Sequence, residues 1–220
     1  GTVIVGADSS GNQLRGLCHY VRNADFTKEV IFGDQHQRNA DSLGCSRAVA
    51  KSYLYAYLFG AGDAKLGQVL TGKANAAVGK KSRADFAKGI KGLTELKDKL
   101  SKVWKNTRFG GGEGKIPGLD GRPIYVASDH QALNYLLQSA EGITCKAAVS
   151  YQMQKIKEEG LRAEARLFYH DETAWACHPD DADRVGQILK ESFAEAPKWF
   201  GVECMDGGDP SMGSSYADVH

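Results

Sequence analysis

Residues 166–177 read RLFYHDETAWAC, and this stretch decides the fold. Two runs rich in apolar and aromatic residues flank a polar tip, which predicts two strands joined by a tight turn. The β-branched run TVIVGA, residues 2–7, predicts another buried strand, and Asp8 follows it directly. If these strands are neighbours, Asp8 lies at the same sheet edge as the turn residues Asp171 and Glu172.

Carboxylates gathered at one sheet edge are able to hold divalent cations. Two such ions about 3.5–4 Å apart support in-line phosphoryl transfer, because one activates an attacking hydroxyl and the other shields the leaving phosphate. Acidic residues are also common in turns that bind nothing. The placement of these acids alone leaves both interpretations open.

Outside these strands, helical patterns alternate with turn signals. Helices are predicted over residues 13–21, 47–59 with Ser46 as the N-cap, 82–105, 132–158 and 182–194, and further strands over 123–128 and 199–205. The stretch 132–158 is either one long helix or two that abut, with Gly142 as a weak point. The polar run DQHQRN indicates a loop that opens a helix, and FGGGEG indicates a loop tip. This order favours an α+β fold, an antiparallel sheet with a helical insertion.

Length and composition exclude disordered, collagen-like and membrane proteins. The 220 residues, 42% apolar and 25% charged, suit one domain of moderate size or two small lobes. No segment approaches the roughly 18–20 apolar residues that span a bilayer, and no signal-peptide pattern is visible. The five cysteines are scattered without a C-x-x-C pair, which predicts reduced thiols in the cytoplasm.

The net charge of +1 conceals two stretches of opposite sign. Residues 46–115 contain 15 Lys and Arg against 5 Asp and Glu, whereas residues 171–220 contain 3 against 11. The basic stretch is able to meet a polyanion, and the acidic stretch is able to gather cations. The alternative is two solvated helical faces that attract one another.

One helical stripe joins cations to aromatic rings. Arg47, Lys51, Tyr55 and Phe59 recur every fourth residue, so each step turns only slightly and rises about 6 Å. Two cations near a helix N-terminus, followed by two rings, match the order of parts in a nucleoside triphosphate. The alternative is an amphipathic helix whose cations extend into solvent.

A second series repeats this spacing with polar side chains: His130, Asn134 and Gln138. Such a face is able to hydrogen-bond base edges in a minor groove, where the acceptors are similar for every base pair. The alternative is a helix start with a solvated face.

Three motifs carry a resemblance to a known family: DSSGNQLR (8–15), RAVAKSYLYAYLFG (47–60) and YHDE (169–172). In this order they resemble the three signature motifs of the family A DNA polymerases, the bacterial polymerase I type. GDQHQRN, GAGD, GLDGR, ALNYLLQSA and the terminal His220 are similar to the replicative phage branch of that family. The resemblance covers almost the whole chain, and it implies a palm that bears metals and fingers that bind the incoming nucleotide.

For the metals, the resemblance implies two Mg²⁺ ions, with Mn²⁺ as a substitute. Asp8 and Asp171 match the family's metal-binding aspartates, and the Ser9 carbonyl matches a further ligand. Glu172 would assist near the metals, and His170 would lie by the primer end.

For the substrates, the resemblance implies dNTPs and primer–template DNA. Arg47, Lys51 and His36 would hold the triphosphate, and Lys51 would also protonate the departing pyrophosphate. The other residues that the resemblance assigns to the nucleotide are Tyr55, Phe59 and Gln13. Those that it assigns to DNA are Asn134, Gln138, His130, His170 and Arg122.

Two residues depart from the family pattern. Gln13 stands where the family has a glutamate that excludes ribonucleotides by crowding the 2′-hydroxyl, and Phe59 stands where it has a tyrosine. Gln and Glu differ little in volume, so we expect most of the sugar discrimination to survive. An amide donor that bonds a 2′-hydroxyl would weaken discrimination by a few-fold to about tenfold. We therefore expect Gln13→Glu to tighten discrimination modestly, and Gln13→Ala to loosen it far more.

The resemblance divides the chain into palm (1–17), fingers (18–122) and palm again (123–220). The family's thumb and 3′–5′ exonuclease have no counterpart in these residues. We therefore expect one half of a split polymerase, active only with an N-terminal partner that carries the thumb; the alternative is a fragment. Two other functions stay open: a non-catalytic DNA-binding or scaffold subunit, and a two-metal nuclease, which has no use for the triphosphate-shaped stripe.

Overall fold

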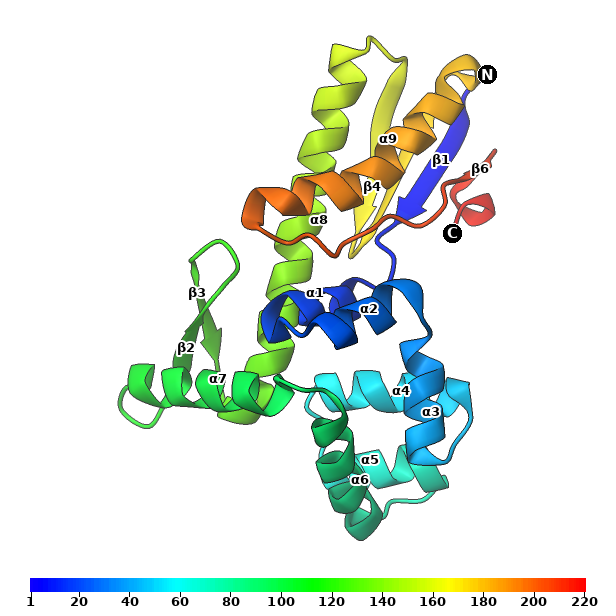
Figure 1. Ribbon diagram of the computed structural model, residues 1–220. Coiled ribbons are helices and arrows are strands. Elements are labelled where there is room, and N and C mark those ends of the chain that lie inside the picture. The colour runs from blue at the N-terminus through cyan, green and yellow to red at the C-terminus, as the bar shows by residue number, and fades with distance from the viewer. The chain divides into compact units, whose positions relative to one another are not determined.

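The chain divides into two units, and the computed structural model describes all of its residues, 1–220 (Figure 1). Unit 1 comprises residues 1–19 and 138–220, and unit 2 comprises residues 20–137. Unit 1 contains a four-stranded antiparallel sheet, and unit 2 is mostly helical. The prediction of an α+β fold with a helical insertion is thus confirmed. The predicted subdomain boundaries at 17 and 122 stay predictions.

The sheet of unit 1 places the decisive stretches side by side. Its strand order is β4-β5-β1-β6, with β1 at Val3–Asp8, β4 at Ala163–Tyr169, β5 at Glu172–Cys177 and β6 at Ser211–Gly213. β5 pairs with β1 so that Asp8 lies opposite Glu172, and it pairs with β4 through the predicted hairpin. The β-branched and aromatic residues of these runs suit the pleated, half-buried surface of such strands.

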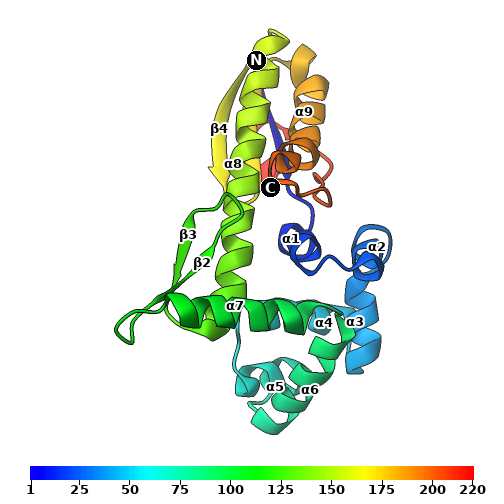
Figure 2. The ribbon, with the colours of Figure 1, turned by 60° about the vertical axis from the view of Figure 1, so that its left-hand side comes forward.

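Two helices pack on one face of this sheet (Figures 1 and 2), α8 (Ala132–Glu158) and α9 (Ala182–Glu195). Val5 and Trp175 are buried in one apolar cluster with residues of both helices, among them Ile156 and Val185. Because side chains alternate along a strand, Asp8 belongs to the opposite face. The apolar core thus packs against one face of the sheet, and the acidic side chains at the strand ends belong to the other face.

A buried polar network joins α8 to the sheet and to α9. The Gln152 amide donates to Thr173 Oγ1 (3.2 Å) and to Ser192 Oγ (2.8 Å), and its Oε1 accepts from Trp175 Nε1 (3.0 Å). All four side chains are buried, so no solvent is at hand to replace a lost partner.

Gln152→Leu should destabilise unit 1 by about 1–3 kcal/mol, because it leaves the Trp175 indole N–H buried without an acceptor. Leucine keeps most of the glutamine volume, so the loss measures the hydrogen bonds. Urea denaturation gives the free energy of unfolding. Gln154→Leu, at an exposed position on the same helix, is the matched control and should change it by less than about 0.5 kcal/mol. Equal stability of Gln152→Leu and the parent would contradict the role of the network.

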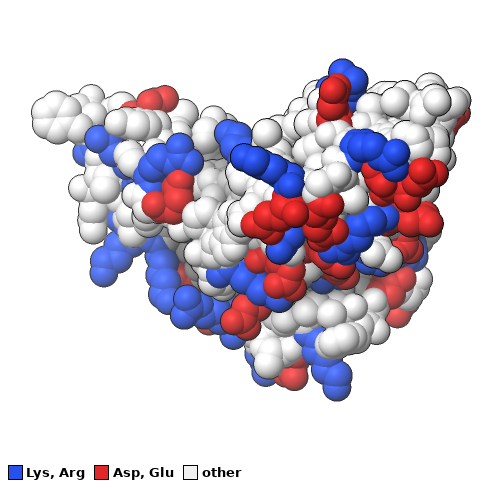
Figure 3. Space-filling model, turned by 90° about the horizontal axis from the view of Figure 1, so that it is seen from above, with Lys and Arg blue, Asp and Glu red and all other residues white.

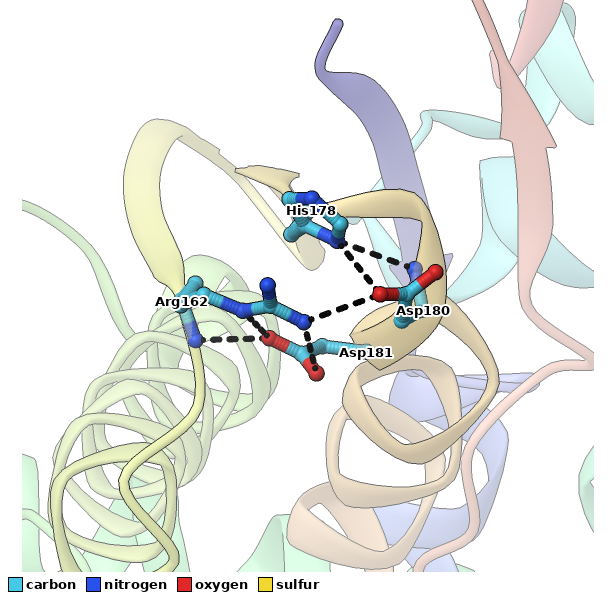
Figure 4. Close-up of polar contacts among 4 residues, drawn as sticks. All are labelled: Arg162, His178, Asp180 and Asp181. Atoms are coloured by element: carbon cyan, nitrogen blue, oxygen red, sulfur yellow. Dashed lines mark hydrogen bonds and ion pairs between the residues drawn. The ribbon is translucent and has the colours of Figure 1, made fainter.

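A second set of polar contacts fastens the start of β4 to the turn before α9 (Figure 4). The Arg162 guanidinium donates to Asp181 through Nε (2.8 Å) and Nη2 (3.0 Å), and the Arg162 backbone N–H donates to the same carboxylate (2.9 Å). Asp180 accepts from Arg162 Nη2 (3.3 Å) and lies 3.2 Å from His178 Nδ1. Figure 3 views the whole molecule from above, and on much of the surface seen there Lys and Arg lie next to Asp and Glu.

Asp181→Asn should lower stability in a pH-dependent way. Hydrogen bonds from the Arg162 side chain and backbone lower the pKa of Asp181 to about 2. Its contribution is complete above the ordinary carboxyl pKa of about 4, and it is lost as the pH falls through the folded-state pKa. The urea midpoints of parent and variant should therefore converge between pH 4 and pH 2. A difference that stays constant over this range would contradict the ion-pair account.

Unit 2 consists of helices, one short hairpin and the first turns of α8. The helices are α2 (Ala24–Phe32), α3 (Gln35–Leu43), α4 (Arg47–Leu58), α5 (Asp63–Thr71), α6 (Ala76–Gly89) and α7 (Leu93–Thr107), and the strands are β2 (Gly114–Pro117) and β3 (Pro123–Val126). α1 (Asn12–Val21) leads into the unit from β1. No helix of the chain combines the length and the apolar character that crossing a bilayer requires.

The predicted helix over residues 82–105 is wrong as one element. The structure has two helices, α6 and α7, separated at Gly92, whose φ of +91° lies in the left-handed region that glycine adopts without strain. The apolar stripe is nevertheless real, since Phe86, Ile90, Leu93, Leu100 and Trp104 are all buried.

Two other local predictions need correction. The segment predicted as a strand over residues 199–205 contains the end of a 3₁₀ turn (Ala196–Phe200) and a loop, and the fourth strand is β6. The polar run DQHQRN does open a helix, as predicted, with Asp34 capping α3 by accepting from the Gln37 backbone N–H at 3.0 Å, but the rest of the run is helical and not a loop. The five cysteines are free, as predicted.

Candidate active site

We call the strand ends that carry Asp8, Asp171 and Glu172 the acidic edge, and the turn between β4 and β5 builds it. His170 has a φ of +54°, which allows the two strands to reverse over a two-residue turn. The backbone N–H of Ser9 donates to the Asp171 carbonyl at 2.8 Å, and this bond locks the turn against the end of β1. Asp8 and Asp171 are thus held at the same end of neighbouring strands, as the sequence predicted.

Both aspartates line one cavity of about 370 Å³. The other residues around it are Glu172, Asp209, Ser211, Val219 and His220. Burial raises the pKa of Asp171, and the nearby charges of Asp8 and Glu172 raise it further. Carboxylates that share a site repel one another in this way, and a bound cation relieves the repulsion.

Glu172 is anchored by the C-terminal residues. Its Oε2 accepts from the Tyr216 hydroxyl at 2.9 Å and lies 2.9 Å from His220 Nδ1, whose ring stacks on Tyr216. Its Oε1 is buried and has no hydrogen-bond partner in the chain. Tyr216 was not predicted from the sequence, because the contact joins residues 44 positions apart.

The loop DGGD, residues 206–209, wraps the end of β1 and was also missed. The Ser10 N–H donates to the Asp206 carbonyl (2.9 Å), and the Gly208 N–H donates to the Asp8 carbonyl (2.8 Å). A Cβ at Gly208 would overlap the Asp8 carboxylate. The paired glycines were the available signal, since a glycine pair in a loop marks close backbone approach.

The residues at this edge fit a magnesium site. They offer the carboxylates of Asp8 and Asp171 but no group of three or more His, Cys, Asp or Glu side chains placed to hold a metal. Mg²⁺ is commonly held by one or two carboxylates, with water and substrate phosphate oxygens completing its shell. The unpartnered Glu172 Oε1 beside them is a further oxygen acceptor.

The cation stripe lies in unit 2 along α4, as predicted. Ser46 caps the helix by accepting from the Val49 N–H, and Arg47 Nε donates to Asp34 Oδ2 at 2.7 Å. Asp34 also caps α3, so one carboxylate joins the first turns of both helices. The Arg47 guanidinium and backbone hydrogen bonds hold the pKa of Asp34 below its usual value.

His36 lies on the same face of unit 2 as the stripe. Burial lowers its pKa, and the charges of Arg47 and Lys51 lower it further. Its Nδ1 is buried without a partner, and its ring centroid is 6.2 Å from that of Tyr55. Tyr55 in turn lies 6.1 Å from Phe59, so the two rings continue the stripe.

The predicted DNA contacts are spread over several elements. Asn134 and Gln138 lie one turn apart on α8, but His130 lies in the 3₁₀ turn Asp129–Gln131 before that helix. Only two of the three residues therefore share a helix. His170 is exposed at the hairpin tip, and Arg122 is exposed in the β2–β3 turn, paired with Asp120.

Gln13 is the second residue of α1 and is bonded within unit 1. Its Nε2 donates to Glu141 Oε2 on α8 at 2.9 Å, and its Oε1 is buried without a partner. The sequence analysis assigned no role to Glu141, because a single glutamate within a helix carries no local signal.

No family model matches the chain, but known DNA polymerases are similar to it. The chain is 30% identical to the DNA-directed DNA polymerase of Escherichia phage T7 and also to that of Enterobacteria phage T3, in each case over 99% of this chain and 33% of the relative. It is 25% identical to DNA polymerase I of Aquifex aeolicus over 90% of this chain and 36% of that protein. The chain thus spans about a third of the length of the curated relatives that it matches.

The fold agrees with these sequence matches. The POL domain of Pol1 from M. smegmatis, solved in complex with DNA primer-template and dNTP, superposes with a TM-score of 0.81 over 99% of this chain and 40% of that chain, at 18% identity. Sequence and structure together show that this chain is homologous to the family A DNA polymerases over almost its whole length and has the fold of their palm and fingers.

Proposed function

We propose that this chain forms the palm and fingers of a DNA-directed DNA polymerase, which adds dNTPs to a primer 3′ end. The observation that carries the proposal is the convergence of Asp8 and Asp171 on one cavity at the ends of paired strands. Unit 1 would act as the palm, and unit 2 as the fingers. The basic stretch from residue 46 to residue 115, which lies in unit 2, supplies charge for a polyanionic substrate.

Asp8, Asp171 and the Ser9 carbonyl would hold two Mg²⁺ ions, with Mn²⁺ as a substitute. When bound, such ions lower the pKa of an attacking hydroxyl and stabilise the charge on the transferred phosphate. The chain's own contribution is to fix the two carboxylates before the substrate arrives. The Ser9–Asp171 backbone bond and the Gly208–Asp8 backbone bond provide this rigidity.

Arg47, Lys51 and His36 would bind the triphosphate. A lowered pKa leaves His36 neutral at pH 7, so its ring offers one N–H donor without adding a third charge. Lys51 would give a proton to the departing pyrophosphate, and the rings of Tyr55 and Phe59 would contact the base. Arg47 would exchange its bond with Asp34 for bonds to phosphate oxygens.

The remaining predicted contacts concern the sugar and the DNA. Gln13 would act as the sugar gate, and His170 at the hairpin tip would lie by the primer end. Asn134 and Gln138 would touch the minor groove, since both present amide groups that suit its acceptors. His130 and Arg122 would contact DNA from unit 2.

An N-terminal half that carries a thumb, with or without an exonuclease, stays a prediction. Primer extension by this chain alone should be weak, and a candidate N-terminal half should raise it strongly. The interface between two such halves should be large and apolar, more than about 2,000 Å² in total. Processive synthesis by the chain alone would contradict the need for a partner, and DNA binding without extension in every combination would favour the scaffold alternative.

A further inference from the structure

The bond between Gln13 and Glu141 joins two helices beside the acidic edge. The neighbouring residue of α1, Asn12, donates to Ser9 Oγ at 2.9 Å and to Cys145 Sγ at 3.3 Å. Glu141 and Cys145 are one turn apart on α8, so α1 meets the same side of α8 twice. This side of α8 therefore sets the position of the first turn of α1, where Gln13 lies.

The chemistry of the pair fixes which end of the Gln13 amide meets Glu141. A carboxylate only accepts hydrogen bonds, so it must receive the amide N–H. The amide oxygen is then directed elsewhere, and it is buried with no partner in the chain. Burial raises the pKa of Glu141, whereas the bond from Gln13 lowers it. Glu141 is thus a desolvated acceptor that receives a side-chain hydrogen bond from Gln13.

We propose that Glu141 is a positioning residue for sugar discrimination, which holds the Gln13 side chain in the place from which it excludes a 2′-hydroxyl. This inference rests on the proposed function. A glutamine has three rotatable side-chain bonds, and a gate that excludes by volume works only while the side chain stays in place. The pair also explains a glutamine at position 13, because a glutamate there would put two carboxylates at hydrogen-bond distance.

The proposal reverses one expectation drawn from the sequence. Gln13→Glu was expected to tighten discrimination, on the premise that the amide donor is available to the sugar. One N–H of that amide is already bonded to Glu141, and a carboxylate in its place would be repelled. Gln13→Glu should therefore loosen discrimination, as Glu141→Ala should. The exchanged pair Gln13→Glu with Glu141→Gln restores an amide–carboxylate bond and should restore discrimination.

The measured quantity is the dissociation constant of ATP divided by that of dATP, so a lower ratio means weaker discrimination. It is obtained by equilibrium titration with Mg²⁺ on a primer–template that has a templating T and a dideoxy primer end, so that binding is read without turnover. Loss of a hydrogen bond to a charged group should lower this ratio about tenfold or more in Glu141→Ala and in Gln13→Glu. ATP should bind more tightly while dATP binding changes by less than about twofold, and the exchanged pair should return to within about threefold of the parent.

A matched control lies on the same helix. Gln154 Nε2 donates to Glu158 Oε1 at 2.7 Å on an exposed face of α8, so Glu158→Ala removes a similar bond away from the site. The ratio of the ATP and dATP dissociation constants should be the same for Glu158→Ala as for the parent. Thermal unfolding of every variant separates a change in sugar discrimination from a loss of stability. The exchanged pair should recover both the ratio and the thermal stability of the parent.

The outcomes separate the inference from the proposed function. A parent that binds ATP as well as dATP, or a ratio unchanged in both Glu141→Ala and Gln13→Glu, would overturn the inference. An exchanged pair that fails to recover the ratio while recovering stability would also overturn it. If the ratios behave as expected but a primer with a free 3′-hydroxyl is never extended, the inference stands and the proposed polymerase activity fails.

Discussion

Asp171→Asn should abolish nucleotide addition by the competent polymerase while leaving DNA binding nearly intact. Asp171 is one of the two aspartates proposed to hold the metals at the cavity by the strand ends, and replacing it would remove a charge that those metals need. Loss of even an outer partner of a metal ligand costs about 10–100-fold, so loss of a ligand should exceed 100-fold. Single-turnover extension of a labelled primer gives the rate, and a filter-binding titration gives the DNA affinity.

Asp209→Asn is the matched control for this experiment. Asp209 lines the same cavity, but its carboxylate pairs with Lys190 Nζ at 2.5 Å and is largely exposed. Its replacement should change the extension rate by less than about twofold, in line with the small effect of exposed ion pairs. If Asp171→Asn extends primers as fast as Asp209→Asn, Asp171 is not a metal ligand and the assignment fails.

Gly208→Ala should lower the rate of nucleotide addition about 100-fold, because a shift of about 1 Å at a reacting group costs this much. The added Cβ would overlap the Asp8 carboxylate, which must then move away from its place in the cavity. Stability should change little, since the Asp8 side chain is exposed and its displacement unpacks no buried group. Extension kinetics and urea denaturation of the same preparation measure the two effects.

Gly142→Ala is the matched control for Gly208→Ala. A Cβ at Gly142 meets open space on α8, so the change should stabilise the helix by about 0.5–1 kcal/mol and leave the rate unaltered. A Gly208→Ala variant with full activity would show that the DGGD loop does not set the position of Asp8.

Local patterns predicted the strands and helices that carry the site. β1, the β4–β5 hairpin and α4 each form from a continuous run whose periodicity and caps lie in neighbouring residues. The proximity of Asp8 and Asp171 followed from one further assumption, that the two acid-bearing strands are neighbours. The resemblance to a known family then supplied roles that no local pattern contains.

The parts that were missed depend on contacts between distant residues. Tyr216 reaches Glu172, and Glu141 reaches Gln13, only after the sheet and α8 have packed. The strand predicted over residues 199–205 failed because its apolar residues are divided between the end of a turn that follows α9 and a loop, whereas the short β6 is strand-like only through its pairing with β1. The break at Gly92 was masked by an apolar stripe that continues across it.

The most direct test of the proposed activity is a single round of templated addition. The chain, with an N-terminal half if one proves necessary, is given a labelled primer–template, Mg²⁺ and each dNTP in turn. We predict a primer one nucleotide longer with the dNTP that complements the template, one pyrophosphate released for each addition, and no product with Asp171→Asn. Addition that ignores the template, or shortening of the primer in place of extension, would contradict the polymerase assignment.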